Sequence, residues 1–205
     1  MALALAAAQV AGCAAHETRP AVAHYLDPAG GIATVNRVVF LPLVNNTDYP
    51  DTEKGLAADL VQAIQARQVF HLEAAPPSTE APPTWGRAGN RAFSLKELAE
   101  MRRAFGCDAV LIGAVNSFHP YPHMGTGLYL RLVDLRGGQL LWAVDHTWDA
   151  GNRQTQRRIE AFFDRCQDTG DNPLEWRVAL VSSRAFQRFV AQEVAETLPD
   201  RTPAR

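Results

Sequence analysis

Apolar and polar positions along the chain predict an alternation of strands and helices. A continuous apolar run over 37–43 has the length of a strand, and its lack of alternation indicates a strand covered on both faces. Leu56, Leu60 and Ile64 then recur at helical spacing and predict an amphipathic helix over 52–67. A short strand is predicted over 69–73. This order is typical of a βαβ unit with parallel strands.

The next elements are a short helix and a run of three strands. Ser94 and Glu97 match a capping box, in which the two residues satisfy each other's amide groups at a helix start, so a helix is predicted from 94 to about 105. The stretch 107–149 has the densest β pattern of the chain and predicts strands over 109–118, 127–135 and 140–148. Arg136, Gly137 and Gly138 supply a hairpin turn between the last two.

Beyond Gly151 the apolar period becomes helical. One helix is predicted around 159–163, and Asn172 and Pro173 open a last helix of about 25 residues, with proline tolerated in the first turn. At 1.5 Å per residue this helix is roughly 37 Å long. The predicted fold class is α/β (α+β): a mixed β-sheet of about five strands in the order βαβαβββαα, with helices packed on the sheet and a long C-terminal helix.

Composition and punctuation divide the chain into four parts. Residues 1–12 are an apolar run that we interpret as a signal peptide, truncated at its start because no Lys or Arg precedes it. Residues 13–34 contain two prolines and a Gly-Gly pair among few periodic positions and predict a lipid-anchored linker. Residues 35–200 form one α/β domain, and 201–205 are expected to be a disordered tail.

The predicted cellular location depends on a short motif. The sequence Val10-Ala11-Gly12-Cys13 resembles the bacterial lipobox, which implies cleavage before Cys13 and lipidation of its sulfur and its new amino group. Several acyl chains would give stable anchoring to a membrane without a spanning helix. Ala14 and Ala15 lack the aspartate that resembles an inner-membrane retention signal, which favours the periplasmic face of the outer membrane. The alternative is a cytosolic protein with an alanine-rich N-terminus.

Charge and cysteine content narrow the classes of partner. The formal net charge is −2 and the arginines are scattered along the chain, so no basic block predicts binding to nucleic acid. Cys107 and Cys166 remain besides Cys13. In an oxidising periplasm the two could pair, whereas Cys107 also opens a strand of buried character and fits a small core residue.

Candidate binding residues are aromatic and histidine side chains beside turns. Trp85 lies in the proline-rich stretch 74–92, where it either covers the edge of the core or contacts a partner. Tyr121 and Tyr129 are expected to rim a surface groove, whereas Trp142 and Trp148 share one face of a strand and are expected in the core. The candidate partner-binding residues are Trp85, His119, Tyr121, His123 and Tyr129.

A search for catalytic chemistry leaves one alternative. The sequence has no nucleophile elbow, P-loop, dinucleotide fingerprint, zinc-protease motif or CxxC pair, so no catalytic residue and no cofactor is predicted. His119, His123 and His146 are the best metal candidates, because the Pro-Tyr-Pro spacer could place two imidazoles near the strand that carries the third. A ligand-binding or metal-binding protein, or an enzyme, using these histidines is the alternative function.

Three segments carry a resemblance to a known family. RVVFLPLVNN at 37–46, FGCDAVLIGAVNS at 105–117 and LRLVDLRGGQLLW at 130–142 resemble the CsgG-like and LpoB-like envelope lipoproteins and the amino-terminal domain of TolB. The resemblance implies the soluble α/β domain of that family, and it carries no catalytic residue. The long hairpins with which CsgG forms a pore are missing from the pattern, because the connections between the predicted strands are short or proline-rich.

The expected function is therefore binding rather than catalysis. The chain is expected to be a non-enzymatic, outer-membrane-anchored periplasmic lipoprotein that binds or scaffolds another envelope protein, or associates with itself. The segment from His119 to His123 is the expected place of contact with a partner.

Overall fold

The computed structural model describes residues 21–76, 92–168 and 176–200. Within them, a mixed sheet has the strand order β1-β7-β6-β5-β2-β4, and β3 pairs with β5. The predicted fold class, a mixed sheet with helices packed on it, is confirmed.

The strands and helices have the following bounds. The strands are β1 (His24–Leu26), β2 (Arg37–Phe40), β3 (Val44–Asn45), β4 (His71–Ala74), β5 (Ala109–His119), β6 (Gly125–Asp134) and β7 (Leu140–Asp149). The helices are η1 (a 3-10 helix, Gly31–Thr34), α1 (Thr52–Ala66), α3 (Leu95–Phe105), α4 (Arg153–Asp168), α5 (Trp176–Ala179) and α6 (Ser183–Ala195).

The sheet has a parallel half and an antiparallel half. Strand β2 pairs in parallel with both β4 and β5, as the predicted βαβ unit requires. Strands β5, β6 and β7 form the predicted antiparallel meander, and its turn reaches a positive φ of 73° at Gly138. Glycine adopts this conformation without steric cost. The central strand β5 therefore joins the two halves.

Two sequence predictions are corrected by the structure. The predicted linker over 13–34 is too long, because β1 and η1 lie within it and β1 pairs with β7. The predicted single C-terminal helix is interrupted between α5 and α6, where Ser182 is extended and its side chain accepts a hydrogen bond from the Ala185 amide. A serine in this geometry is an N-cap, so it starts a new helix where the apolar period alone predicts continuity.

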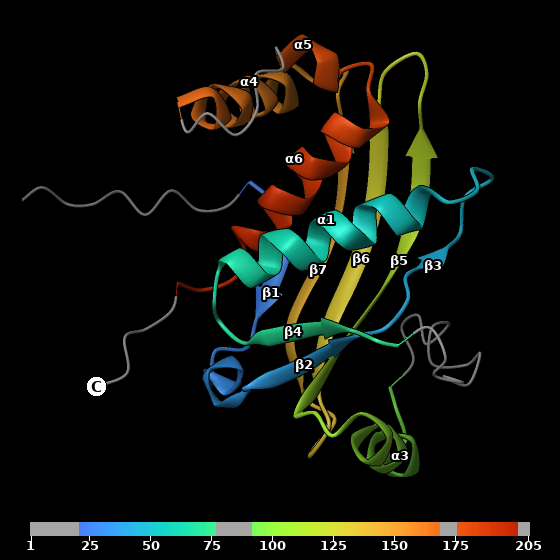
Figure 1. Cartoon of the computed structure of the whole chain (residues 1–205), viewed down its shortest axis with the longest axis vertical. Helices are drawn as coiled ribbons and strands as arrows, with labels where there is room; N and C mark the ends of the chain where they lie inside the picture. Colours follow the sequence, from blue (N-terminus) through green and yellow to red (C-terminus); the bar gives the residue numbers. More distant parts are fainter. Residues whose placement is uncertain (1–20, 77–91, 169–175, 201–205) are drawn as a thin grey trace, which may run out of the picture.

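The helices cover the sheet from two sides (Figure 1). α1 and α6 lie side by side on one face, where they bury the main core together with residues of α4. α3 packs on the other face near the end of the sheet where β5 begins, and its buried residues Leu98, Met101 and Phe105 contact Val110 and Ile112 of that strand in a second core.

In the described parts of the chain, no helix has both the length and the apolar character needed to cross a membrane.

Candidate functional site

The connection between β5 and β6 projects beyond the end of the sheet. Pairing of these two strands stops at His119 and Gly125. Pro120 and Pro122 carry no amide hydrogen and cannot extend the ladder. This tip meets the loop before α1 and the junction of α5 with α6, and together they line a hollow of about 450 Å³. We call this end of the molecule the apex surface; it consists of Tyr49, Phe118, Pro120, Tyr121, Pro122, Met124, Leu180, Val181 and Ser183.

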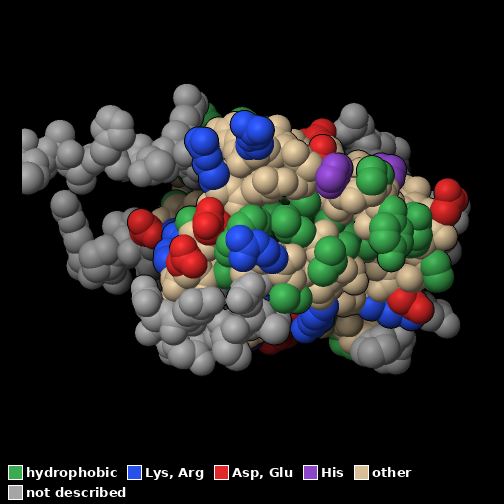
Figure 2. Space-filling view, turned by 90° about the horizontal axis from the view of Figure 1, so that it is seen from above, with side chains coloured by type: hydrophobic (Ala, Val, Ile, Leu, Met, Phe, Trp, Pro, Cys, Tyr) green, Lys and Arg blue, Asp and Glu red, His purple; other side chains and the backbone are tan. Residues whose placement is uncertain are grey.

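The apex surface exposes large apolar side chains to solvent. Tyr121 is 85% exposed, Val181 80% and Tyr49 43%. Beneath them the Phe118 ring is buried and contacts Tyr49 edge to face, with 5.3 Å between ring centroids. Figure 2 looks onto this end and shows apolar side chains gathered beside histidine side chains. A contiguous exposed apolar patch is typical of a surface that contacts another molecule.

The three histidines of the predicted metal site do not converge. Residues that pair directly across neighbouring strands point to the same face of a sheet. Gly125 pairs with His119 on one side and with Asp149 on the other, so the side chains of His119 and Asp149 lie on one face. His146 is three positions before Asp149 on β7, so it points to the opposite face. Among the described residues, no group of three His, Cys, Asp or Glu side chains could hold a metal ion. The structure therefore does not form the candidate site of His119, His123 and His146.

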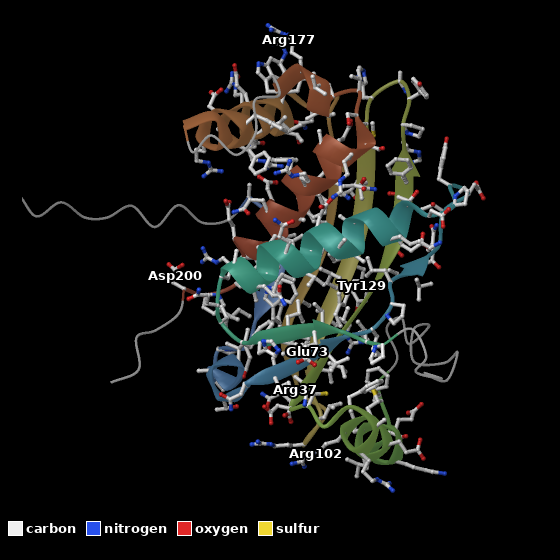
Figure 3. All side chains as sticks on the ribbon, in the orientation of Figure 1. Arg37, Glu73, Arg102, Tyr129, Arg177 and Asp200 are labelled. Carbon is white, nitrogen blue, oxygen red and sulfur yellow. The ribbon has the colours of Figure 1, made fainter. Side chains whose placement is uncertain are left out.

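The other predicted binding residues do not gather at the apex surface. Tyr129 is half-buried in the middle of β6, between Ala114 of β5 and Asp145 of β7. It is four residues from Gly125, or about 13 Å along the strand, and Figure 3 shows it far from the apical Arg177. The predicted groove rimmed by Tyr121 and Tyr129 is therefore not formed. Trp85 lies outside the described residues.

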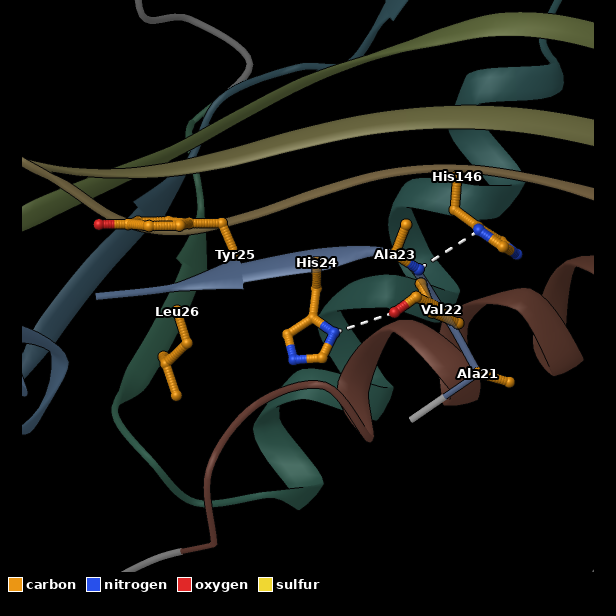
Figure 4. Close-up of a pocket in the computed structure, with 7 residues that line it drawn as sticks. All are labelled: Ala21, Val22, Ala23, His24, Tyr25, Leu26 and His146. Atoms are coloured by element: carbon orange, nitrogen blue, oxygen red, sulfur yellow. Dashed lines mark hydrogen bonds between the residues drawn. The ribbon is translucent and has the colours of Figure 1, made fainter. Parts of the chain in front are cut away.

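His146 instead holds the edge strand β1 in place (Figure 4). Its Nδ1 accepts a hydrogen bond from the Ala23 amide at 3.3 Å, and the amide of the preceding residue, Asp145, donates to the Ala23 carbonyl at 3.4 Å. Burial lowers the pKa of His146, and the nearby Arg158 charge lowers it further. The imidazole is therefore kept neutral, which is the state in which Nδ1 can accept a hydrogen bond.

A buried polar cluster joins β7 to α4 and α6. The indole Nε1 of Trp148 donates to the Glu193 carboxylate at 2.7 Å, and Arg158 Nε lies 3.0 Å from the other carboxylate oxygen. Burial raises the pKa of Glu193, while the Trp148 hydrogen bond and the Arg158 charge oppose that shift. These contacts fix β7 against α4 and α6.

Cys107 is a free thiol buried in the second core. Burial raises its pKa, which disfavours the reactive thiolate. Of the two expectations for this residue, the structure favours the small core residue.

A second apolar surface lies at the open edge of the sheet. Strand β4 is the last strand of the described sheet, and beside it a groove of about 420 Å³ runs between the carboxyl ends of β2 and β4 and the outer side of α1. Ala58 and Ala74 on its wall are exposed. We call this the edge groove; it is lined by Phe40, Leu41, Pro42, Ala57, Ala58, Val61, Ala74 and Ala75.

Sequence reasoning missed the edge groove and the contributions of Tyr49 and Val181 to the apex surface. For the groove a signal was present: Ala57, Ala58 and Val61 make α1 apolar beyond its Leu56, Leu60 and Ile64 stripe. Ala57 and Val61 pack only partly against the main core, and Ala58 is exposed, so part of this second stripe remains at the surface. For the apex surface, residues distant in sequence are joined only by the tertiary fold.

Neither a known protein family nor a curated protein sequence matches the chain. The chain aligns with solved structures that include the PelC dodecamer from Paraburkholderia phytofirmans, with 20% identity over 63% of this chain and 80% of that one and a TM-score of 0.46. Lipoprotein GNA1162 from Neisseria meningitidis aligns with 18% identity over 65% of this chain and 99% of that one, with a TM-score of 0.43. The LpoB C-terminal domain from Escherichia coli aligns with 17% identity over 56% of this chain and 83% of that one, with a TM-score of 0.37. The function must therefore follow from the residues of this chain.

Proposed function

We propose that this chain is a non-enzymatic, lipid-anchored periplasmic protein of the outer membrane that binds another envelope protein or a second copy of itself. The lipobox at Val10–Cys13 supports the address, and the resemblance to CsgG-like and LpoB-like segments supports a binding or scaffolding role. The apolar edge groove beside the edge strand β4 is the observation that carries the binding role.

The edge groove has the chemistry of a peptide-binding surface. An edge strand presents backbone groups to which an extended segment can add as a further strand, and a neighbouring apolar groove can receive its side chains. The backbone groups of Leu72 and Ala74 point away from β2, toward the open edge. Gln65 Nε2 already donates to the Leu72 carbonyl at 2.6 Å, whereas Ala74 is exposed. The groove lies outside the carboxyl ends of two parallel strands, which is the usual side for binding in such sheets.

The proposed membrane location is tested by replacing the lipidation site. In Cys13→Ala the acylated sulfur is absent, so we expect the protein to leave the membrane fraction and appear in the soluble periplasmic fraction. Mass spectrometry of the wild-type N-terminus is expected to show the lipid on Cys13. A Cys13→Ala protein that stays with the membrane would contradict the anchor.

The binding role is tested by charging the edge groove. Ala58→Arg and Ala74→Arg each place a long cation on an exposed position of its wall, so the fold should be retained. We expect chemical cross-linking in the native envelope, followed by affinity purification of the full chain, to recover a specific partner or a self-linked dimer. Both variants should lose this cross-linked partner or dimer.

Ala161→Arg is the matched control, because Ala161 is an exposed alanine of α4 away from the groove. It should cross-link as the wild type does. Equal cross-linking of all four proteins would rule out the edge groove as the contact surface.

A further inference from the structure

The first described residues lie toward the same end of the sheet as the apex surface. β7 runs to the apex and ends at Asp149, which faces Gly125 at the β5–β6 tip. β1 is antiparallel to β7, with Ala23 next to Asp145, so the chain before β1 comes from the apical side. Asp145 is four residues before Asp149 on β7, which places Ala23 about 13 Å below the apical end of β7. Figure 4 shows Ala21 at the end of this segment opposite to its arrowhead.

The distance between this point and the proposed anchor is limited by the length of the chain. Residues 14–20 separate Cys13 from Ala21. Eight steps of at most 3.6 Å span no more than about 29 Å. If the acyl chains on Cys13 lie in the bilayer, Ala21 is therefore held within about 29 Å of the lipid headgroups. The apical end of the domain is closer to Ala21 than the α3 end is, because β1 and β7 extend from it toward α3.

The side chains of the apex surface suit a lipid headgroup region. Tyr121 and Val181 are its most exposed members, and tyrosine is enriched where an apolar ring meets a hydrated interface. Trp176 and Arg177 lie on α5 at the same end, where the guanidinium stacks over the indole at 5.1 Å, and Figure 3 shows Arg177 at the extremity of the molecule. An exposed guanidinium beside the headgroups is attracted to anionic lipid.

We propose that the apex surface rests on the phospholipid bilayer, with Tyr121 and Val181 at the level of the headgroups. This inference rests on the lipid anchor proposed above. It orients the whole domain: the sheet stands on its apical end and α3 points away from the membrane. The edge groove then remains free for a protein partner.

The test measures the depth of a reporter in lipid. Full-length lipidated protein is reconstituted into vesicles of phosphatidylethanolamine and phosphatidylglycerol, with or without bromine on the acyl chains, since bromine quenches indole fluorescence at short range. Tyr121→Trp places an indole on the apex surface. Leu95→Trp is the matched control, because Leu95 is 76% exposed on α3 at the opposite end. Fluorescence of the parent chain, with its own four tryptophans, is subtracted.

We expect brominated lipid to lower the fluorescence added by Tyr121→Trp and to leave that added by Leu95→Trp unchanged. Quenching of Leu95→Trp to the same or a greater extent would overturn the orientation. An unquenched Tyr121→Trp in protein that carries its lipid would also overturn it. Both sites are exposed, so the substitutions should not prevent folding.

Failure of the anchor gives a different result. A wild-type chain without lipid on Cys13, or one that does not co-float with the vesicles, would remove both the proposed address and the orientation that depends on it. Protein that floats with the vesicles but shows no quenching contradicts the orientation alone.

Discussion

At the scale of single residues, His146 shows how a side chain can carry a role that its type does not suggest. In the sequence it is a metal candidate, yet in the structure its neutral imidazole accepts the Ala23 amide and fixes β1. The prediction that Trp142 and Trp148 are core residues is confirmed, since they are 1% and 0% exposed. Their hydrogen-bond partners, Thr197 and Glu193, are about 50 residues away and could not be predicted without the fold.

The lowered pKa of His146 predicts a pH dependence of stability. Protonation is less favourable in the folded state than in the unfolded state, whose pKa is about 6.5. The neutral imidazole therefore contributes stability above about pH 6.5, and this contribution is lost as the pH falls through that value toward the folded pKa. We expect urea unfolding to show that His146 contributes less stability at pH 5.5 than at pH 7.5.

His146→Asn is the comparison for this measurement, because its amide oxygen can accept the Ala23 hydrogen bond and does not titrate. The buried carboxyl groups of Asp59 and Glu193, whose pKa values are raised, favour the opposite trend, and they are present in both proteins. The wild type should therefore lose more stability than the variant between the two pH values. Equal losses in the two proteins would show that protonation of His146 does not weaken the attachment of β1.

At the scale of elements, local signals predicted the start of α3 well. Ser94 and Glu97 form the predicted capping box: the Glu97 amide donates to Ser94 Oγ at 3.3 Å, and the Ser94 amide donates to the Glu97 carboxylate at 2.8 Å. Ser94→Ala removes the acceptor at the helix start, so the free energy of unfolding should fall by about 1 kcal/mol. Urea denaturation measures this loss, and Ser183→Ala, an exposed serine outside a capping position, should change stability little.

The close pairing of β5 with β6 predicts the effect of a single methyl group. A Cβ added at Gly113 would lie 2.5 Å from the Tyr129 carbonyl oxygen and 2.5 Å from a Leu130 methyl group. Because a backbone atom must move, Gly113→Ala should destabilise the domain by about 2 kcal/mol or more. Gly137→Ala is the control, since its nearest neighbour would be 3.6 Å away at Asp134. A thermal melt of both variants distinguishes them, and similar melting temperatures would contradict the tight pairing.

Short elements and helix interruptions were not predictable in the same way. β1 has three residues and β3 has two, which is too few for an alternating pattern to stand out. The break before α6 depends on the conformation of Ser182, while the apolar period continues across it. Elements with a capping box or a long alternating run were found, and elements that depend on tertiary pairing were not.

At the scale of the whole molecule, the sequence predicted the fold class and the Tyr121 part of the apex surface, but not the edge groove or the other members of the apex surface. Hydrophobic pattern determines which side of each element faces the core, so the mixed sheet and its βαβ unit followed from it. The apex surface instead combines Tyr49, Tyr121 and Val181, which come from three separate connections. Their meeting depends on the lengths of β5 and α6, which periodicity gives only to within a few residues.

The short tether makes a prediction about the orientation of the whole domain. Inserting about 20 glycine and serine residues before Ala21 would raise the largest possible distance between Ala21 and the proposed anchor from about 29 Å to about 100 Å. The effective concentration of the bilayer at the apex surface would fall, so quenching of Tyr121→Trp by brominated lipid should decrease while the protein stays in the vesicle fraction. Unchanged quenching would show that the apex surface holds to lipid without help from the tether.

The direction of β1 also has a mechanical consequence. If the proposed anchor at Cys13 and a protein partner hold the domain from two sides, the pull from the anchor enters the described structure at Ala21. Because β1 runs antiparallel to β7 and away from the apical end, this force acts along the strand axis and loads the hydrogen bonds of Asp145 to Ala23 and of Asp27 to Leu141 together, in shear. A pair loaded in shear yields at a higher force than one opened bond by bond. The three residues of β1 would then carry tension from the proposed anchor to β7 and through it to the rest of the sheet.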